Sequence, residues 1–209
     1  MESFNPSSRR SAEAIAEGFG SWFDGCQYVY LDVGTNIGIQ IRKVFEPELF
    51  PEAKVLPIFD EIIGTNRSSR HDLCVVGFEP NIHHTTRLQE LETAYLRRGW
   101  RVKIFTETAV ALKNGEADFF FDTVAPAQRH QWGASLIPYH ETMRDDQGSS
   151  DGGKRTAAAK ATVHTMDLAD YIVRYVAARH HDTGRNHQIL MKLDIEGAEH
   201  ELLPHLILT

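Results

Sequence analysis

Short apolar runs alternate with helix-like stretches along this chain, a pattern typical of an α/β fold. The run at residues 28–33 is apolar at nearly every position, as expected for a central parallel strand that is covered on both faces. Residues 101–105 instead alternate charged and apolar side chains, which suits a strand at the edge of a sheet. Together with the runs at 73–79 and 188–194, the pattern predicts four strands of one mostly parallel sheet.

The spacing of apolar residues also predicts what lies between these strands. We expect helices at residues 12–23, from a cap at Asn36 to about Phe45, at 82–98, after a cap at Asp167, and at 197–203. Prolines and a glycine interrupt residues 47–72, which are predicted to be an inserted loop with one short helix at 58–63. A second insertion, polar and glycine-rich, is expected at 141–161, and β segments are expected at 117–121 and 133–137.

The composition limits the classes of protein that need to be considered. With 209 residues, of which 42% are hydrophobic and 24% charged, the chain is long enough for one domain with a substantial core. We expect this domain at residues 28–209, preceded by an N-terminal helical extension at 1–27. The formal net charge is -7 and no basic run occurs, so a nucleic-acid partner is disfavoured.

The cysteines and the N-terminus bear on cellular location. The chain has only Cys26 and Cys74, and the second lies inside an apolar run. This usage does not indicate a disulfide scaffold and favours a reducing compartment. The N-terminus lacks the features of a signal peptide, and no run approaches the roughly 20 apolar residues of a membrane-spanning helix. The sequence therefore predicts a cytoplasmic protein without a membrane span.

Polar residues follow the ends of the first two predicted strands, where a parallel sheet presents groups to a ligand. Gly34 and Gly38 would let the backbone turn sharply, and the N–H groups at the start of the next helix would suit a carboxylate. Asp32, just before this turn, could accept hydrogen bonds from an ammonium group. Glu79 ends the second strand, and a carboxylate in this position can accept hydrogen bonds from both hydroxyls of a ribose.

A third polar run, Lys192–Glu199, follows the last predicted strand. Asp194 would face the same cleft as Asp32 if the two strands are neighbours, and Glu196 would lie at the mouth of the following helix. Two such carboxylates could orient an acceptor hydroxyl or take its proton. Helix capping and solvated charge are the alternative for Glu196.

Four motifs, in this order, resemble those of the FkbM-type methyltransferases. That family carries a strand ending in D-V-G-A/T-N-I-G, then F-E-P-N, a T-L-D helix start, and a K-x-D-x-E-G-A-E run. The matching segments here are Asp32–Gly38, Phe78–Asn81, Thr165–Asp167 (with methionine at position 166) and Lys192–Glu199. Weaker similarities are found at Thr108–Val110, followed by Gly115 and Glu116, and at Gly133–Leu136; the resemblance covers roughly residues 28–203.

The resemblance implies a Rossmann-like class I methyltransferase fold and S-adenosylmethionine (SAM) as cofactor. It also implies methyl transfer to a hydroxyl group of a small-molecule, glycan or lipid acceptor. Catalytic roles would fall to Asp194 and Glu196. Cofactor binding would fall to the residues at the strand ends, namely Asp32, Gly34, Thr35, Asn36, Gly38, Glu79, Thr108 and Ala109.

The family's usual sheet has seven strands, whereas little of this chain follows the strand that ends at Asp194. The resemblance therefore implies a C-terminally incomplete domain with strand order 3-2-1-4. We expect one flank of the fourth strand to be unpaired and apolar side chains near it to be exposed.

Other functions are less well supported by the residues. A nicotinamide-dependent oxidoreductase would be expected to carry G-x-G-x-x-G after the first strand, and the chain does not. A methyltransferase-like domain that has lost activity and serves as an interaction module remains an alternative.

A metal site is disfavoured, because the eleven histidines include adjacent pairs that point to different helix faces and lack the spacing of structural zinc sites.

Overall fold

A four-stranded parallel sheet and a smaller three-stranded sheet form the framework of the chain. The computed structural model describes residues 21–121, 135–136, 160–180, 187–195 and 197–209. The central sheet has the order β3-β2-β1-β7, in which the strands are Arg101–Thr106, Leu73–Glu79, Tyr28–Val33 and Gln188–Leu193. All three neighbouring pairs are parallel. The predicted strands, their order and the edge position of β3 are thus confirmed.

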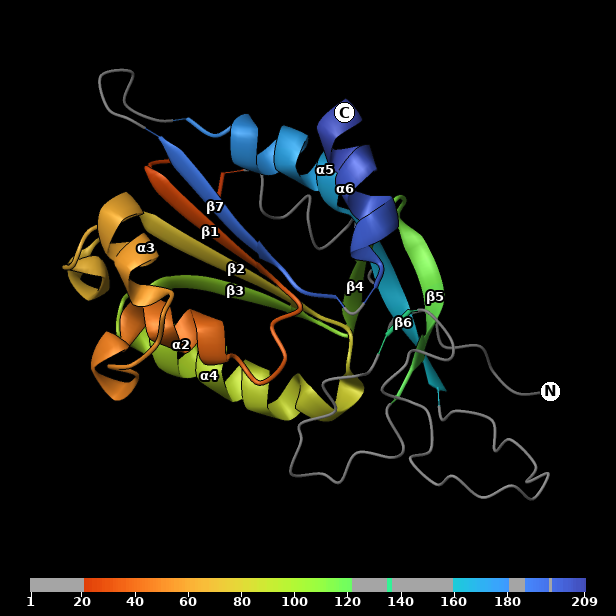
Figure 1. Cartoon of the computed structure of the whole chain (residues 1–209), viewed down its shortest axis with the longest axis horizontal. Helices are drawn as coiled ribbons and strands as arrows, with labels where there is room; N and C mark the ends of the chain where they lie inside the picture. The colour runs from red at the N-terminus through yellow and green to blue at the C-terminus, as the bar shows by residue number, and fades with distance from the viewer. Residues whose placement is uncertain (1–20, 122–134, 137–159, 181–186, 196) are drawn as a thin grey trace.

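Helices cover both faces of the central sheet (Figure 1). On one face lie α2 (Ile39–Phe45), α3 (Leu56–Ile62) and α4 (Thr85–Arg97). On the other lie α5 (Leu168–Tyr171), which continues as a π-helical turn at Ile172–Ala177, and α6 (Glu199–Leu208). This layering explains why β1 is apolar on both sides, since it packs against two separate cores. Such an α/β arrangement is compatible with a Rossmann-like fold.

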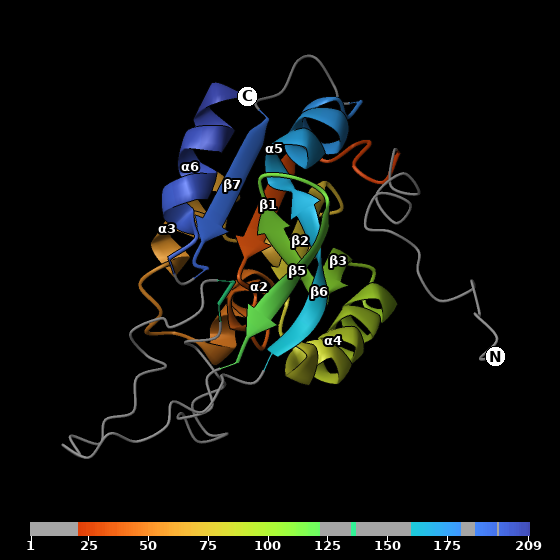
Figure 2. The same ribbon diagram turned by 90° about the vertical axis from the view of Figure 1, so that its right-hand side faces the viewer.

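The smaller sheet lies beyond the carboxyl ends of the central strands (Figures 1 and 2). Its order is β4-β6-β5, with β4 at Thr108–Ala111, β5 at Gly115–Phe120 and β6 at Lys160–Asp167. The expected β segment at 117–121 corresponds to β5, whereas β4 was not expected as a strand. Of the segment expected at 133–137, only Ser135 and Leu136 are described, and Ser135 forms an isolated bridge with Phe120.

Several helix predictions need correction. The helix after β1 begins at Ile39 with Gly38 as its N-cap, not at Asn36, although it ends at Phe45 as expected. The helix expected at 82–98 begins as a 3-10 turn, Ile82–His84, before α4. The last helix reaches Leu208 rather than Leu203, whereas the cap at Asp167 is confirmed, since its side chain accepts a hydrogen bond from the Asp170 N–H. The helix expected at 12–23 and the insertion at 141–161 fall mainly outside the described residues.

Residues 47–72 are more ordered than a looped-out insertion. Besides α3 they form 3-10 helices at Pro47–Leu49 and Arg67–Ser69. Phe59 and Ile63 join the core beneath α2. The Arg67 side chain is buried and donates hydrogen bonds to the Val44 and Gly64 carbonyls. The segment therefore covers one face of the fold rather than projecting from it.

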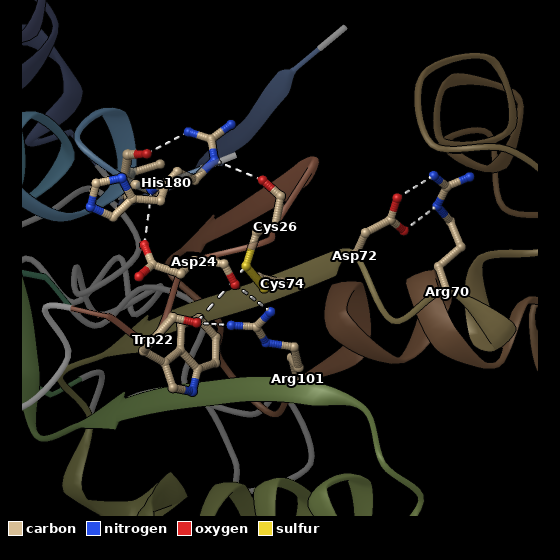
Figure 3. The surroundings of a disulfide bond; sticks show 10 residues. Trp22, Asp24, Cys26, Arg70, Asp72, Cys74, Arg101 and His180 are labelled. Atoms are coloured by element: carbon tan, nitrogen blue, oxygen red, sulfur yellow. Dashed lines mark hydrogen bonds and ion pairs between the residues drawn. A yellow bond between two sulfur atoms is a disulfide. The ribbon is translucent and has the colours of Figure 1, made fainter. Parts of the chain in front are cut away.

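A disulfide joins Cys26, just before β1, to Cys74 in β2 (Figure 3). The pair links the amino ends of the two strands, with a Cα–Cα distance of 5.8 Å. Side chains around it reinforce the same end: Arg101 donates hydrogen bonds to the Trp22 and Asp24 carbonyls, and the Asp24 carboxylate accepts one from the His180 N–H. The expectation of a chain without a disulfide is thus wrong, and the argument for a reducing compartment that rested on it no longer holds.

None of the described helices has the length and apolar character that a membrane span needs. The described part of the chain also contains no group of three or more His, Cys, Asp or Glu side chains arranged to hold a metal ion.

We predict that reducing the disulfide lowers the free energy of unfolding by roughly 4 kcal/mol, because the bond constrains the unfolded chain across a separation of 48 residues. The measurement is urea unfolding of the oxidised and the reduced protein, with thiol labelling to verify each state. A double variant, Cys26→Ala with Cys74→Ala, is the control that should not respond to reductant. Equal unfolding midpoints for the oxidised and reduced protein would contradict the prediction.

Candidate functional site

A cavity of about 500 Å³ opens at the carboxyl ends of β1, β2 and β7, where the alternation of strands and helices leaves polar loops side by side. Its wall is built from the β1–α2 turn, one face of α2, the end of β2, strands β4 and β5, and the β7–α6 connection. The lining residues are Val33, Gly34, Thr35, Asn36, Ile37, Ile39, Gln40, Lys43, Phe78, Glu79, Pro80, Ala109, Val110, Phe119, Leu136, Lys192, Asp194, Ile195 and Ala198.

The two glycines of the β1–α2 turn are required by packing. Gly34 has φ +80°, and a Cβ on it would overlap the backbone carbonyl oxygen of Asp194. Gly38 has φ +84°, and a Cβ there would lie 2.5 Å from a methyl group of Leu91 in α4. Gly34 lines the cavity, whereas Gly38 is not part of its wall. Close approach of neighbouring segments therefore explains both residues without a ligand.

The amides of residues 34–38 already have acceptors within the protein, whereas no described residue accepts a hydrogen bond from the Ile39, Gln40 and Ile41 N–H groups at the start of α2. Gly34 and Thr35 both donate to the Phe78 carbonyl, and Gly38 donates to the Thr35 carbonyl. The Asn36 N–H donates to Glu79, and the Ile37 N–H donates to the Asn36 side chain, both within the stretch that was expected to hold a carboxylate. A ligand carboxylate at residues 34–38 would have to compete with these acceptors, so these five amides do not form a preformed carboxylate site.

Glu79 lies in the cavity wall, as predicted, and it also connects two loops. Its Oε2 accepts a hydrogen bond of 2.6 Å from the Asn36 N–H, and its Oε1 accepts one of 2.9 Å from the Asn81 N–H. The Nδ1 atom of His84 lies 3.7 Å from Oε1. A carboxylate can accept about four hydrogen bonds, so capacity remains for two ligand hydroxyls.

Asp32 lies beneath the cavity rather than in its wall. The side chain is completely buried, and neither carboxylate oxygen has a hydrogen-bond partner among the described residues. Burial raises the pKa of Asp32 to about 7; Lys192 opposes this rise, and the Glu79 and Asp194 carboxylates add to it. A direct contact between Asp32 and a ligand ammonium group is therefore not available in this conformation.

Lys192 connects β7 to the β1–α2 turn, a role that its place in the sequence motif did not reveal. Its Nζ donates a 2.6 Å hydrogen bond to the Gly34 carbonyl. The same Nζ lies 3.2 Å from Asp194 and 3.7 Å from the buried Asp32 carboxylate. Asp194 lines the cavity with a side chain that is 63% exposed, which suits contact with a ligand. Glu196, its predicted catalytic neighbour, lies outside the described residues.

The end of the cavity near the small sheet is apolar. Ala109 lines it as predicted, together with Val110 and Phe119. Thr108 does not, because its side chain is buried and donates a hydrogen bond to the Thr106 carbonyl. Phe119 packs in the apolar cluster of the small sheet and also contributes to the cavity wall. Residues 109, 110 and 119 come from two strands, so only the fold brings them together.

Two other lining residues, Gln40 and Lys43, were not predicted as site residues. They lie in α2 with Ile39, and Lys43 follows Gln40 by three positions and Ile39 by four. This helical spacing was visible in the sequence, but it did not show that the face borders the cavity.

Comparisons with protein-family models, with curated proteins and with solved structures found no match to this chain.

We predict that Gly34→Ala destabilises the protein much more than Gly25→Ala. Both glycines have nearly the same positive φ, +80° and +77°, so the two variants share the backbone strain of about 1–2 kcal/mol. Only at Gly34 does the added methyl group meet another backbone segment, whereas nothing lies within 4 Å of a Cβ on Gly25. Chemical unfolding of both variants measures the difference. If the two variants lose equal stability, the close packing of Gly34 on Asp194 is contradicted.

We also predict that Asp32→Asn stabilises the protein, increasingly so as the pH rises. Because the pKa of Asp32 is about 7 in the folded state and near 3.8 in the unfolded state, the folded state binds more protons between these values and wild-type stability falls across this range. Asparagine removes that cost, so the gain should grow by roughly 2–3 kcal/mol between pH 5 and pH 8. Urea unfolding at both pH values tests this, with Asp194→Asn as an exposed control. A gain that does not change with pH would show that Asp32 ionises normally.

Proposed function

We propose that this chain binds SAM in the cavity at the carboxyl ends of β1, β2 and β7 and transfers its methyl group to an acceptor hydroxyl. The observation that carries the proposal is the position of Glu79. It ends β2 inside the cavity wall, with an apolar wall from the small sheet on one side and the exposed carboxylate of Asp194 on the other. In this arrangement Glu79 corresponds to the ribose of a nucleoside, the apolar wall to its base, and Asp194 to the reactive centre.

The residues divide the cavity into parts that fit a nucleoside. Glu79 would accept hydrogen bonds from the two ribose hydroxyls, and its contacts with the Asn36 and Asn81 amides hold the carboxylate in place for this role. Ala109, Val110 and Phe119 would border the adenine, because an aromatic base gains from apolar surfaces on its faces.

The turn between β1 and α2 would border the methionine part. Thr35 and Asn36 line this stretch of the cavity, and Lys192 holds the turn through the Gly34 carbonyl. Asp32 would act only indirectly, through its attraction for Lys192. Its expected direct contact with the ammonium group is therefore not part of the proposal.

Asp194 is the residue best suited to act on the acceptor. When bound, SAM supplies a methyl group activated by its sulfonium. The protein then needs to align the acceptor oxygen with that methyl group, exclude water and receive the hydroxyl proton. The Asp194 carboxylate is exposed in the cavity and lies 3.2 Å from Lys192, which keeps it oriented. It could hydrogen-bond the acceptor hydroxyl and take its proton, with Glu196 as the second expected carboxylate.

We predict that the purified protein binds SAM and not NAD. We also expect 2′,3′-dideoxyadenosine to bind at least tenfold more weakly than adenosine, because hydrogen bonds to a charged carboxylate contribute about 1.5–3 kcal/mol each. Titration calorimetry measures these affinities. The ligand is varied rather than Glu79, since changing this residue would also leave the Asn36 and Asn81 amides without their acceptor.

Two outcomes would contradict the proposal. Binding of NAD without SAM would favour an oxidoreductase. Equal binding of adenosine and its dideoxy form would remove the ribose role of Glu79.

A further inference from the structure

The cavity extends along α2, beyond the part assigned to the nucleoside and the methyl-transfer point. Ile39, Gln40 and Lys43 line this extension from one side, and Ile195 and Ala198 line the cavity from the β7–α6 connection. Lys43 follows Gln40 by three positions and Ile39 by four, so it lies on the same side of the helix as each of them. The extension therefore combines apolar side chains with one amide and one cation.

Lys43 differs from the other charged residues of the cavity wall. Glu79 accepts two backbone hydrogen bonds, and Lys192 and Asp194 form an ion pair with each other. Lys43 is half-buried and has no ion pair with any residue in the described part of the chain. The neighbouring Arg42 pairs with Glu46, the C-cap of α2, and α2 itself contains no carboxylate that could pair with Lys43.

Gln40 provides a second polar group beside Lys43 on the same helix face. Its Oε1 atom is buried and has no hydrogen-bond partner among the residues that the structure describes. The NH₂ group at the other end of the amide is neither buried nor hydrogen-bonded to a described residue, so it can donate to a ligand in the cavity.

We propose that Lys43 and Gln40 form an anion subsite that binds a carboxylate or phosphate group of a ligand in this cavity. The amides of residues 34–38 already have acceptors within the protein, so an anionic ligand group needs a partner other than these five. Ile39, one turn before Lys43 on α2, strengthens the attraction by reducing the access of water. The anion is either the amino-acid end of the methyl donor or an acidic group on the acceptor. The assignment of the anion to the methyl donor or to the acceptor rests on the proposed methyl transfer, whereas the existence of the anion subsite does not.

The first experiment compares S-adenosylhomocysteine with 5′-methylthioadenosine, which lacks the amino-acid end. Their dissociation constants are measured for the wild type and for Lys43→Gln, with Lys54→Gln as the control for loss of an exposed lysine outside the cavity wall. If Lys43 binds the donor carboxylate, Lys43→Gln weakens S-adenosylhomocysteine binding about ten- to hundredfold. It then leaves 5′-methylthioadenosine binding unchanged, and Lys43→Arg retains most of the affinity.

The second experiment tests an acidic acceptor. Hexanoate, hexyl phosphate and hexanol are titrated into the protein loaded with S-adenosylhomocysteine. If the anion belongs to the acceptor, the two anions bind more tightly than hexanol, and only Lys43→Gln abolishes the difference. Either pattern supports the subsite.

The subsite is wrong if Lys43→Gln and Lys54→Gln behave alike with every probe. If the wild type binds neither adenosine compound, methyl transfer is contradicted. The subsite can then still be tested by titrating hexanoate, hexyl phosphate and hexanol into the unloaded wild-type protein. The subsite predicts that the two anions bind more tightly than hexanol. Absence of that preference would overturn it.

Discussion

The close approach of the β1–α2 turn to the end of β7 positions every other part of the candidate site. Gly34 lies against the Asp194 backbone so tightly that no Cβ fits between them, and Lys192 closes the contact through the Gly34 carbonyl. This contact fixes where the turn leaves the sheet, and thereby where Asn36 can donate to Glu79. The cavity forms between these segments because the parallel register brings the ends of β1, β2 and β7 to the same level.

The charged residues around this contact differ in their access to the cavity. Asp32 is fully buried, and Lys192 lies close enough to attract it without forming a hydrogen bond. Lys192 itself lines the cavity, as do Asp194 and Lys43. Burying Asp32 costs stability at neutral pH. This cost is consistent with a role in holding Lys192, and hence the turn, although that role is indirect.

Much of the fold could be predicted from the sequence, because apolar runs set the strands and polar residues follow their ends. Glu79 and Asp194 were found in this way, and both lie in the cavity wall. Asp32 was misjudged, because a polar residue at the end of a strand can point beneath the loop as well as into the cleft. The Cys26–Cys74 bond depends on the β1–β2 register, which no local pattern reveals. Lys43 was missed because helical spacing alone does not show which face of α2 borders a cavity.

The most direct test of the account is methyl transfer itself. The protein is incubated with SAM carrying a labelled methyl group and with a cell extract, alongside an Asp194→Asn variant whose SAM affinity is measured in parallel. The account predicts that a component of the extract gains the label, and that Asp194→Asn binds SAM but transfers far less of it. SAM binding without transfer to any component would contradict the enzymatic role and favour a domain that only binds.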